Sequence, residues 1–235
     1  MPDPVPLLLL PGLLCDARLW RDPLALLGDA VAATVADLAQ DDTLNAMARR
    51  ALAAAPPRFA LAGLSMGGYV ALEIMRQAPE RVTHLALFDT SARPDSPEAA
   101  RRRRGLMALS RSGQFKGVTP RLLPSLLHPD AVEGPLGHEV RDMADRIGKE
   151  AFLRQQLAIL HRPDSRPMLP GIRVPTLVAV GEADILTPPE LSEEMAAAIP
   201  GARLALIPQS GHLPTMERPE ASTALLRDWL ARPPG

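Results

Sequence analysis

Gly63-Leu64-Ser65-Met66-Gly67-Gly68 places a serine between glycines where an apolar, strand-like run meets a run with helical periodicity. This arrangement is typical of the nucleophile elbow, a strained turn that exposes a hydroxyl group. Glycines are needed there because side chains at positions 63 and 67 would collide as the chain doubles back. Taken alone, the pattern also fits an ordinary turn or a helix N-cap. The rest of the sequence must therefore distinguish a catalytic serine from a structural one.

Two further residues follow in the chain order that such a serine nucleophile requires, an acid and then a histidine. Asp184 comes just after the strand-like run 176–180, and His212 comes just after the run 203–207. The carboxyl ends of parallel strands meet at one edge of a sheet, where open α/β sheets form their binding crevice. We therefore expect Ser65, Asp184 and His212 to lie close together.

Strand-like and helix-like segments alternate along most of the chain, which predicts an α/β fold with a mostly parallel sheet and helices on both faces. The predicted strands are 5–10, 31–36, 59–63, 82–88, 174–180 and 203–207. The predicted helices are 17–27, 43–55, 66–77, 188–198 and 219–231, with Asp16, Thr43 and Pro188 as starts of three of them. The continuous apolar run Leu7 to Leu10 favours a central strand covered on both faces.

In these motifs the chain resembles the α/β-hydrolase fold family, in the serine-nucleophile branch that contains esterases and lactonases. The elbow and three other stretches carry the resemblance: Leu10-Pro11-Gly12-Leu13, Gly181-Glu182-Ala183-Asp184 with Thr187-Pro188-Pro189, and Ser210-Gly211-His212 with Glu217-Arg218-Pro219. The resemblance covers nearly all of the chain. It implies a six-stranded sheet without the family's usual first hairpin, so the sheet should be wholly parallel, with strand 31–36 at an edge.

The alternation stops between Thr90 and Val174, where prolines interrupt arginine-rich and leucine-rich stretches. The resemblance implies a small helical cap over the active site there. We expect a core domain of residues 1–92 and 166–235 and a cap of residues 93–165; alternatively, these helices complete the core. Apolar cap residues are candidates for the substrate pocket: Leu106, Leu109, Leu122, Leu126, Phe152 and Leu157.

The implied chemistry is nucleophilic catalysis by Ser65. A serine hydroxyl needs a base at neutral pH, and His212 would take its proton while Asp184 orients the imidazole. The backbone amides of Leu13 and Met66 would form the oxyanion hole. Asp89, at the end of strand 82–88, is a rival for the acid because some relatives place the carboxylate there.

One departure concerns the first loop, where family members commonly carry His-Gly and this chain has Pro11-Gly12. The oxyanion amide stays available, but what braces the loop is left open.

Cys15 lies near this loop without a base-bearing motif, and we interpret it as a buried, inert thiol. Arg101 to Arg104 could bind an anionic substrate, although consecutive helical residues point in different directions and a solvated helix surface explains them as well.

The composition of the chain limits which partners and cofactors we expect. The chain is 46% hydrophobic with a formal net charge of −1, so it has no electrostatic bias towards nucleic acid or membrane surfaces. The run 5–10 is too short for a membrane helix and follows Asp3 rather than a basic region. A single cysteine excludes an internal disulfide and a cysteine metal cluster. We expect no cofactor, no metal and a cytoplasmic location.

The predicted function is a carboxylesterase-like serine hydrolase that cleaves a small-molecule ester or thioester through an acyl-enzyme. An enol-lactone hydrolase is the nearest alternative, and hydrolysis of a carbon–carbon bond is a more distant one. A third possibility is a ligand receptor or protein-binding module that keeps the triad with negligible turnover. Serine at the elbow argues against the branches of the family whose nucleophile is an aspartate.

Overall fold

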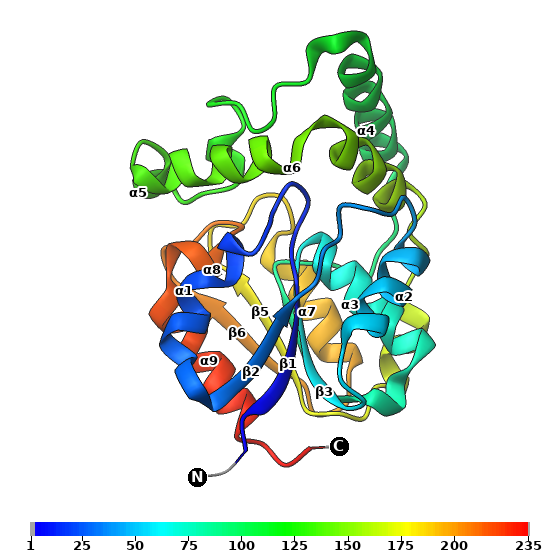
Figure 1. Cartoon of the computed structure of the whole chain (residues 1–235), viewed down its shortest axis with the longest axis vertical. Coiled ribbons are helices and arrows are strands. Elements are labelled where there is room, and N and C mark those ends of the chain that lie inside the picture. The colour runs from blue at the N-terminus through cyan, green and yellow to red at the C-terminus, as the bar shows by residue number, and fades with distance from the viewer. Residues whose placement is uncertain (1–2, 235) are drawn as a thin grey trace.

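The computed structural model describes residues 3–234, and these contain one six-stranded sheet with helices on both faces and a cap above it (Figure 1). The strands are β1 (Val5–Leu10), β2 (Val31–Val35), β3 (Phe59–Leu64), β4 (Val82–Phe88), β5 (Thr176–Gly181) and β6 (Arg203–Ile207). Their order is β2-β1-β3-β4-β5-β6, and every neighbouring pair is parallel. The predicted parallel sheet with β2 at an edge is confirmed. β1 is paired on both sides as expected, but it lies next to the edge strand, whereas β3 and β4 occupy the middle.

Successive side chains of each strand point to opposite faces of the sheet, and helices cover both faces. Leu8 and Leu10 of β1 join the cluster beneath the helices α2 (Leu44–Ala54), α3 (Met66–Gln77) and α7 (Pro189–Ala198). Leu7 and Leu9 join the opposite cluster, with α1 (Arg18–Leu27) and α9 (Pro219–Leu230). The short helix α8 (Pro214–Glu217) also packs on α1. This division explains why the run Leu7 to Leu10 has no polar position.

The helix starts differ slightly from the predicted ones. Thr43 caps α2 as expected, since its hydroxyl accepts a hydrogen bond from the Ala46 amide at 3.2 Å. Pro189, rather than Pro188, takes the first helical position of α7, where a fixed φ is favourable. Asp16 accepts from the Arg18 amide at 2.9 Å, but it precedes the residue that flanks α1.

Three further helices lie between β4 and β5 and form the cap: α4 (Pro97–Leu109), α5 (Pro129–Val132) and α6 (Pro135–Leu160). They lie above the carboxyl ends of the strands (Figure 1). Non-helical dihedral angles at Gly148 (φ 75°) break α6 into two segments. Of the helices in residues 3–234, none is both long enough and apolar enough to cross a membrane.

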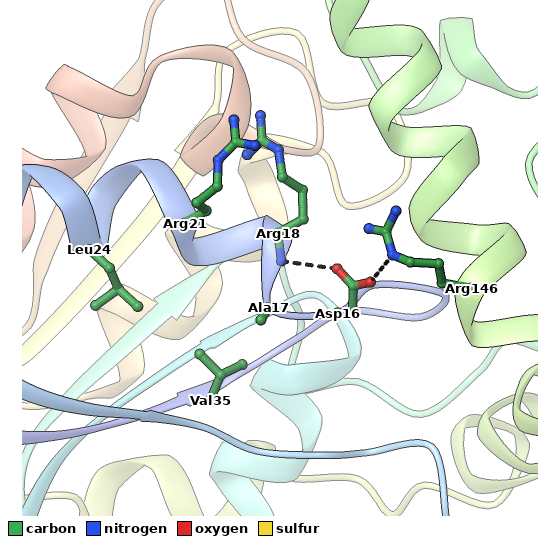
Figure 2. A pocket seen from close by; sticks show the side chains of 7 residues that line it. All are labelled: Asp16, Ala17, Arg18, Arg21, Leu24, Val35 and Arg146. Carbon is green, nitrogen blue, oxygen red and sulfur yellow. Dashed lines mark hydrogen bonds and ion pairs between the residues drawn. The ribbon is translucent and has the colours of Figure 1, made fainter.

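Ion pairs connect the cap to the core beside α1. The Nε atom of Arg146 in α6 lies 2.7 Å from Asp16 Oδ2, and Arg18 of α1 pairs with Glu139 of α6. A dashed line in Figure 2 marks the contact between Arg146 and Asp16. Ion pairs at or near the surface contribute little to stability, so we interpret these two pairs as contacts that orient the cap. Asp16, Arg18 and Arg146 are among the residues that line the surface hollow in Figure 2, and Ser65 is not one of them.

Candidate active site

Ser65 lies at the junction of β3 and α3 in a strained conformation, with φ 55° and ψ −116°. A non-glycine residue with such angles costs on the order of 1–3 kcal/mol and persists only where its surroundings hold it. Two hydrogen bonds from β4 and the loop after it do so. The Ser65 amide donates to the Phe88 carbonyl at 2.9 Å, and Thr90 Oγ1 donates to the Ser65 carbonyl at 2.7 Å.

The flanking glycines are required because the backbone approaches itself at this turn. A Cβ atom at Gly63 would lie 2.3 Å from the Gly67 carbonyl oxygen, and one at Gly67 would lie 2.1 Å from the Leu10 carbonyl oxygen. Both oxygens belong to backbone that cannot move without displacing β1 or the start of α3. The collision expected from the sequence is therefore confirmed.

The three predicted polar residues are brought together by hydrogen bonds. His212 Nε2 lies 2.8 Å from Ser65 Oγ, and His212 Nδ1 lies 2.8 Å from Asp184 Oδ2. Asp184 also accepts from Thr187 Oγ1 at 2.6 Å and from the Leu186 amide at 2.9 Å. An ionised carboxylate can only accept, so Nδ1 carries the imidazole proton and Nε2 is free to accept the proton of the serine hydroxyl.

Asp184 is held in the ionised form. Burial alone would raise its pKa, but the charge of His212 and the hydrogen bonds from His212 and Thr187 outweigh burial and lower the pKa below its ordinary value. A permanently charged acceptor beside Nδ1 fixes the tautomer of His212 and stabilises the imidazolium when it forms.

Asp89, the rival acid, lies fully buried at the end of β4, and its Oδ1 accepts from the Gly181 amide at 2.8 Å. Among the described residues, its Oδ2 atom has no hydrogen-bond partner. Burial, followed by the charge of Asp184, raises the pKa of Asp89 well above its ordinary value. Burial thus favours the protonated form of Asp89, and the acid that contacts His212 is Asp184.

Asp89, Asp184 and His212 offer potential metal-ligand atoms within 4.8 Å of one another. A cation held by His212 Nδ1 and Asp184 Oδ2 would compete with the 2.8 Å hydrogen bond that joins these two atoms. Coordination would break that bond and leave Nδ1 without its acceptor, so the arrangement fits a proton better than a metal ion.

Leu13 lies in the loop between β1 and α1, and Met66 begins α3 directly after Ser65. Neither amide donates a hydrogen bond within residues 3–234. What braces the first loop is Gln155, a buried residue of α6. Its Oε1 accepts from the amide of Leu14, which has φ 60°, at 3.0 Å, and its Nε2 donates to the Leu38 carbonyl at 3.2 Å. A cap glutamine thus supports the loop that carries Pro11, a contact that no local motif indicates.

Replacing Gln155 with leucine should lower kcat by up to about 100-fold, because the turn that carries the Leu13 amide loses its anchor. The variant leaves the Leu14 amide unpaired, which costs on the order of 1–3 kcal/mol of stability. Steady-state kinetics with a denaturation curve would measure both effects. Arg154→Ala is the matched control, since Arg154 Nε donates to the Ala39 carbonyl at 2.8 Å and does not contact this turn. Equal kcat losses in the two variants would contradict this role.

Glu217 is a second residue whose role the sequence did not reveal, although it belongs to a motif that follows His212. Its buried carboxylate accepts from the amides of Gly211 at 2.9 Å and Leu213 at 3.1 Å, on either side of the histidine. It also accepts from the His128 amide of the cap at 2.6 Å, and the His212 amide donates to the Leu126 carbonyl at 2.9 Å. The histidine loop and the cap are therefore directly connected.

A cavity of about 690 Å³ lies between the cap and the core, with Ser65 and His212 in its wall. Five of the six predicted pocket residues line it: Leu106, Leu109, Leu122, Leu126 and Phe152. Leu157, the sixth, is half-buried on α6 and does not line the cavity. It follows Phe152 by five residues, which turns it roughly 140° away around the helix axis.

Cys15 also lines this cavity and is half-buried rather than fully buried. Burial, with a smaller contribution from the charge of Asp16, raises the pKa of its thiol to about 12. The thiol donates weakly to the Leu13 carbonyl at 3.5 Å. Cys15 therefore stays protonated at neutral pH, which agrees with an unreactive thiol.

Known proteins similar to this chain include esterases and a lactonase. A pimeloyl-[acyl-carrier protein] methyl ester esterase of Neisseria meningitidis is 33% identical over 72% of this chain and 68% of the relative. The structure of a thermophilic esterase from Thermogutta terrifontis is 34% identical, covers 96% of this chain and 89% of that chain, and has a TM-score of 0.85. An enol-lactonase from Burkholderia xenovorans is 26% identical, with coverages of 98% and 93% and a TM-score of 0.87. Residues 7–224 match the Alpha/beta hydrolase family, and the chain belongs to this family.

Proposed function

We propose that the protein is a serine hydrolase that cleaves a carboxylic ester of a small molecule through an acyl-enzyme. The observation that carries the proposal is the unbroken series of hydrogen bonds from Ser65 Oγ through His212 to Asp184, with both His212 contacts at 2.8 Å. This series lies in the wall of a largely apolar cavity that opens beside the elbow. The relatives named as esterases support the reaction class.

In the proposed reaction, His212 Nε2 accepts the hydroxyl proton while Ser65 Oγ attacks the ester carbonyl. The negative charge that develops on the carbonyl oxygen is stabilised by the Leu13 and Met66 amides, and losing one such donor costs roughly 3 kcal/mol. The intermediate then expels the alcohol, which takes the proton from His212. Water repeats these steps on the acyl-enzyme and regenerates Ser65.

The same site could open a lactone, because a lactone is an ester whose alcohol remains attached to the acyl group. The enol-lactonase with similar structure favours this as the second candidate substrate class. We further propose that residues 1–92 and 166–235 are the core that carries the reaction, and that residues 93–165 are a cap that selects the substrate. Thioesters would follow the same steps with a thiol as leaving group.

A ligand receptor with the same three residues would differ from the proposed enzyme in the number of ester molecules that each protein molecule cleaves. The proposed enzyme releases nitrophenol from p-nitrophenyl esters continuously, over many cycles for each Ser65. A single stoichiometric release followed by arrest, in a protein that remains folded, would contradict the enzyme and favour the receptor.

Enlarging the cavity should change which acyl chain is preferred. Leu106→Ala and Leu122→Ala remove apolar side chains from the cavity wall, so kcat/KM should shift towards longer chains, with each buried methylene worth about 1–3 kcal/mol. A series of p-nitrophenyl esters of increasing chain length measures the shift. Leu157→Ala is the control and should keep the wild-type preference, because Leu157 does not line the cavity. An unchanged preference in both cavity variants would mean that the acyl chain binds elsewhere.

A further inference from the structure

The first part of the cap is strongly basic, in contrast to the nearly neutral chain. Residues 97–127 contain seven basic side chains and one acidic side chain, Glu98, whereas the whole chain has a formal net charge of −1. The same segment supplies α4 and the loops that enclose the cavity above Ser65. Positive charge is therefore concentrated where a substrate would enter.

The four consecutive arginines of α4 have different surroundings. Arg103 points inwards, where its Nε lies 2.8 Å from Asp95 Oδ2 and its guanidinium also bonds to Gln156. Arg102 lines the cavity, whereas Arg101 and Arg104 are exposed and do not line it. The helix thus has one structural arginine, one that faces the cavity and two that face solvent.

Three cations line the cavity, and none of them is neutralised by the protein. Arg102, Lys116 and Arg121 have exposed side chains without an ion-pair or hydrogen-bond partner in residues 3–234. Some arginines outside the cavity are paired, as in Arg50 with Asp41 at 2.6 Å and Arg93 with Glu194 at 2.9 Å, whereas Arg101 and Arg104 are exposed and unpaired within residues 3–234. None of the cavity-lining residues is an aspartate or a glutamate.

Unpaired cations around a partly apolar cavity create a positive potential that concentrates anions. Guanidinium groups bind carboxylates through charge-assisted hydrogen bonds. The remaining wall is apolar and includes Leu109, Met143 and Phe152, which suit an aliphatic chain. A ligand that fits both the cations and the apolar wall has an aliphatic acyl chain with an anionic group at a distance from the ester carbonyl.

We propose that Arg102, Lys116 and Arg121 form a subsite for a carboxylate at the far end of the acyl chain, so that the preferred substrate is a half-ester of a dicarboxylic acid. This inference rests on the proposed ester hydrolysis at Ser65. It adds what the triad cannot specify, namely the charge of the substrate and the residues that recognise it.

The test compares mono-p-nitrophenyl esters of dicarboxylic acids with neutral p-nitrophenyl alkanoates of equal chain length. The ratio of kcat/KM for the charged ester to that for the neutral ester should exceed one in the wild type. It should fall about threefold for each of Arg102→Gln, Lys116→Gln and Arg121→Gln, and more in the triple variant, as for partly exposed ion pairs. Added salt should lower the wild-type ratio, because it screens the exposed charges.

Arg101→Gln and Arg104→Gln are matched controls that remove the same charge from the same helix outside the cavity, and they should keep the wild-type ratio. An unchanged ratio in the triple variant would overturn the subsite. An equal fall in the controls would also overturn it, because the whole basic face would then attract the anion.

Failure of the subsite is distinguishable from failure of the proposed function. If neutral esters turn over without any preference for charged ones, only the subsite is wrong. If no ester turns over, the subsite is still tested by fluorophosphonate labelling of Ser65. A dicarboxylate half-amide should then slow labelling of the wild type more than that of the triple variant, and equal slowing would reject the subsite.

Discussion

Ser65→Ala is expected to abolish ester hydrolysis, with kcat falling on the order of 10⁶-fold, as when the serine of a serine protease triad is removed. The hydroxyl oxygen is the atom that becomes acylated, and a methyl group cannot replace it. The variant should also lose all labelling by a fluorophosphonate probe. Turnover of a p-nitrophenyl ester and in-gel fluorescence of the labelled protein measure the two effects.

The fold should survive this substitution. Alanine at position 65 removes only an oxygen atom and keeps the backbone bonds to Phe88 and Thr90 that hold the turn. A thermal unfolding curve close to that of the wild type is the control. Labelling that persists on another residue of a folded Ser65→Ala variant would reject Ser65 as the nucleophile.

Asp184→Asn should lower kcat by about 10⁴-fold, as in serine proteases that lose the same carboxylate. The asparagine amide would donate to His212 Nδ1, so the imidazole proton would move to Nε2, facing Ser65. His212 could then no longer accept the serine proton. The measurement is kcat for a p-nitrophenyl ester in a variant that is shown to be folded.

Asp89→Asn is the matched comparison, since it makes the same chemical change in the neighbouring carboxyl group. Burial favours the neutral form of Asp89, and an asparagine oxygen can still accept from the Gly181 amide. We expect kcat to change by less than about tenfold, because no charge beside His212 is lost. A large loss in Asp89→Asn with a small one in Asp184→Asn would reverse the assignment of the acid.

Local patterns were sufficient to predict the elements that position this site. Helix α3 begins and ends where its periodicity and Pro79 indicated, and β4 has its predicted bounds. Asp184 and His212 each follow a strand of one parallel sheet, so their chain order and the sheet edge were enough to predict that they approach Ser65.

Contacts between distant segments were not predictable in this way. Gln155 meets Leu14 across 141 positions in the chain, and nothing near either residue marks the pair. Leu157 resembled a pocket residue because it is apolar and lies in the cap, but only the helical phase of α6 shows that it faces elsewhere. The four arginines of α4 likewise differ only in the direction each side chain takes.

The most direct test of the account is to identify the atom that carries the acyl group during turnover. Enzyme mixed with a slowly hydrolysed p-nitrophenyl ester should release a burst of nitrophenol equal to the enzyme concentration. After acid quenching and peptide digestion, mass spectrometry should find the acyl group on the peptide that contains Ser65, attached to that serine. An acyl group on Cys15 or another residue, or sustained hydrolysis without a burst or an adduct for every slow ester tried, would contradict the acyl-enzyme at Ser65.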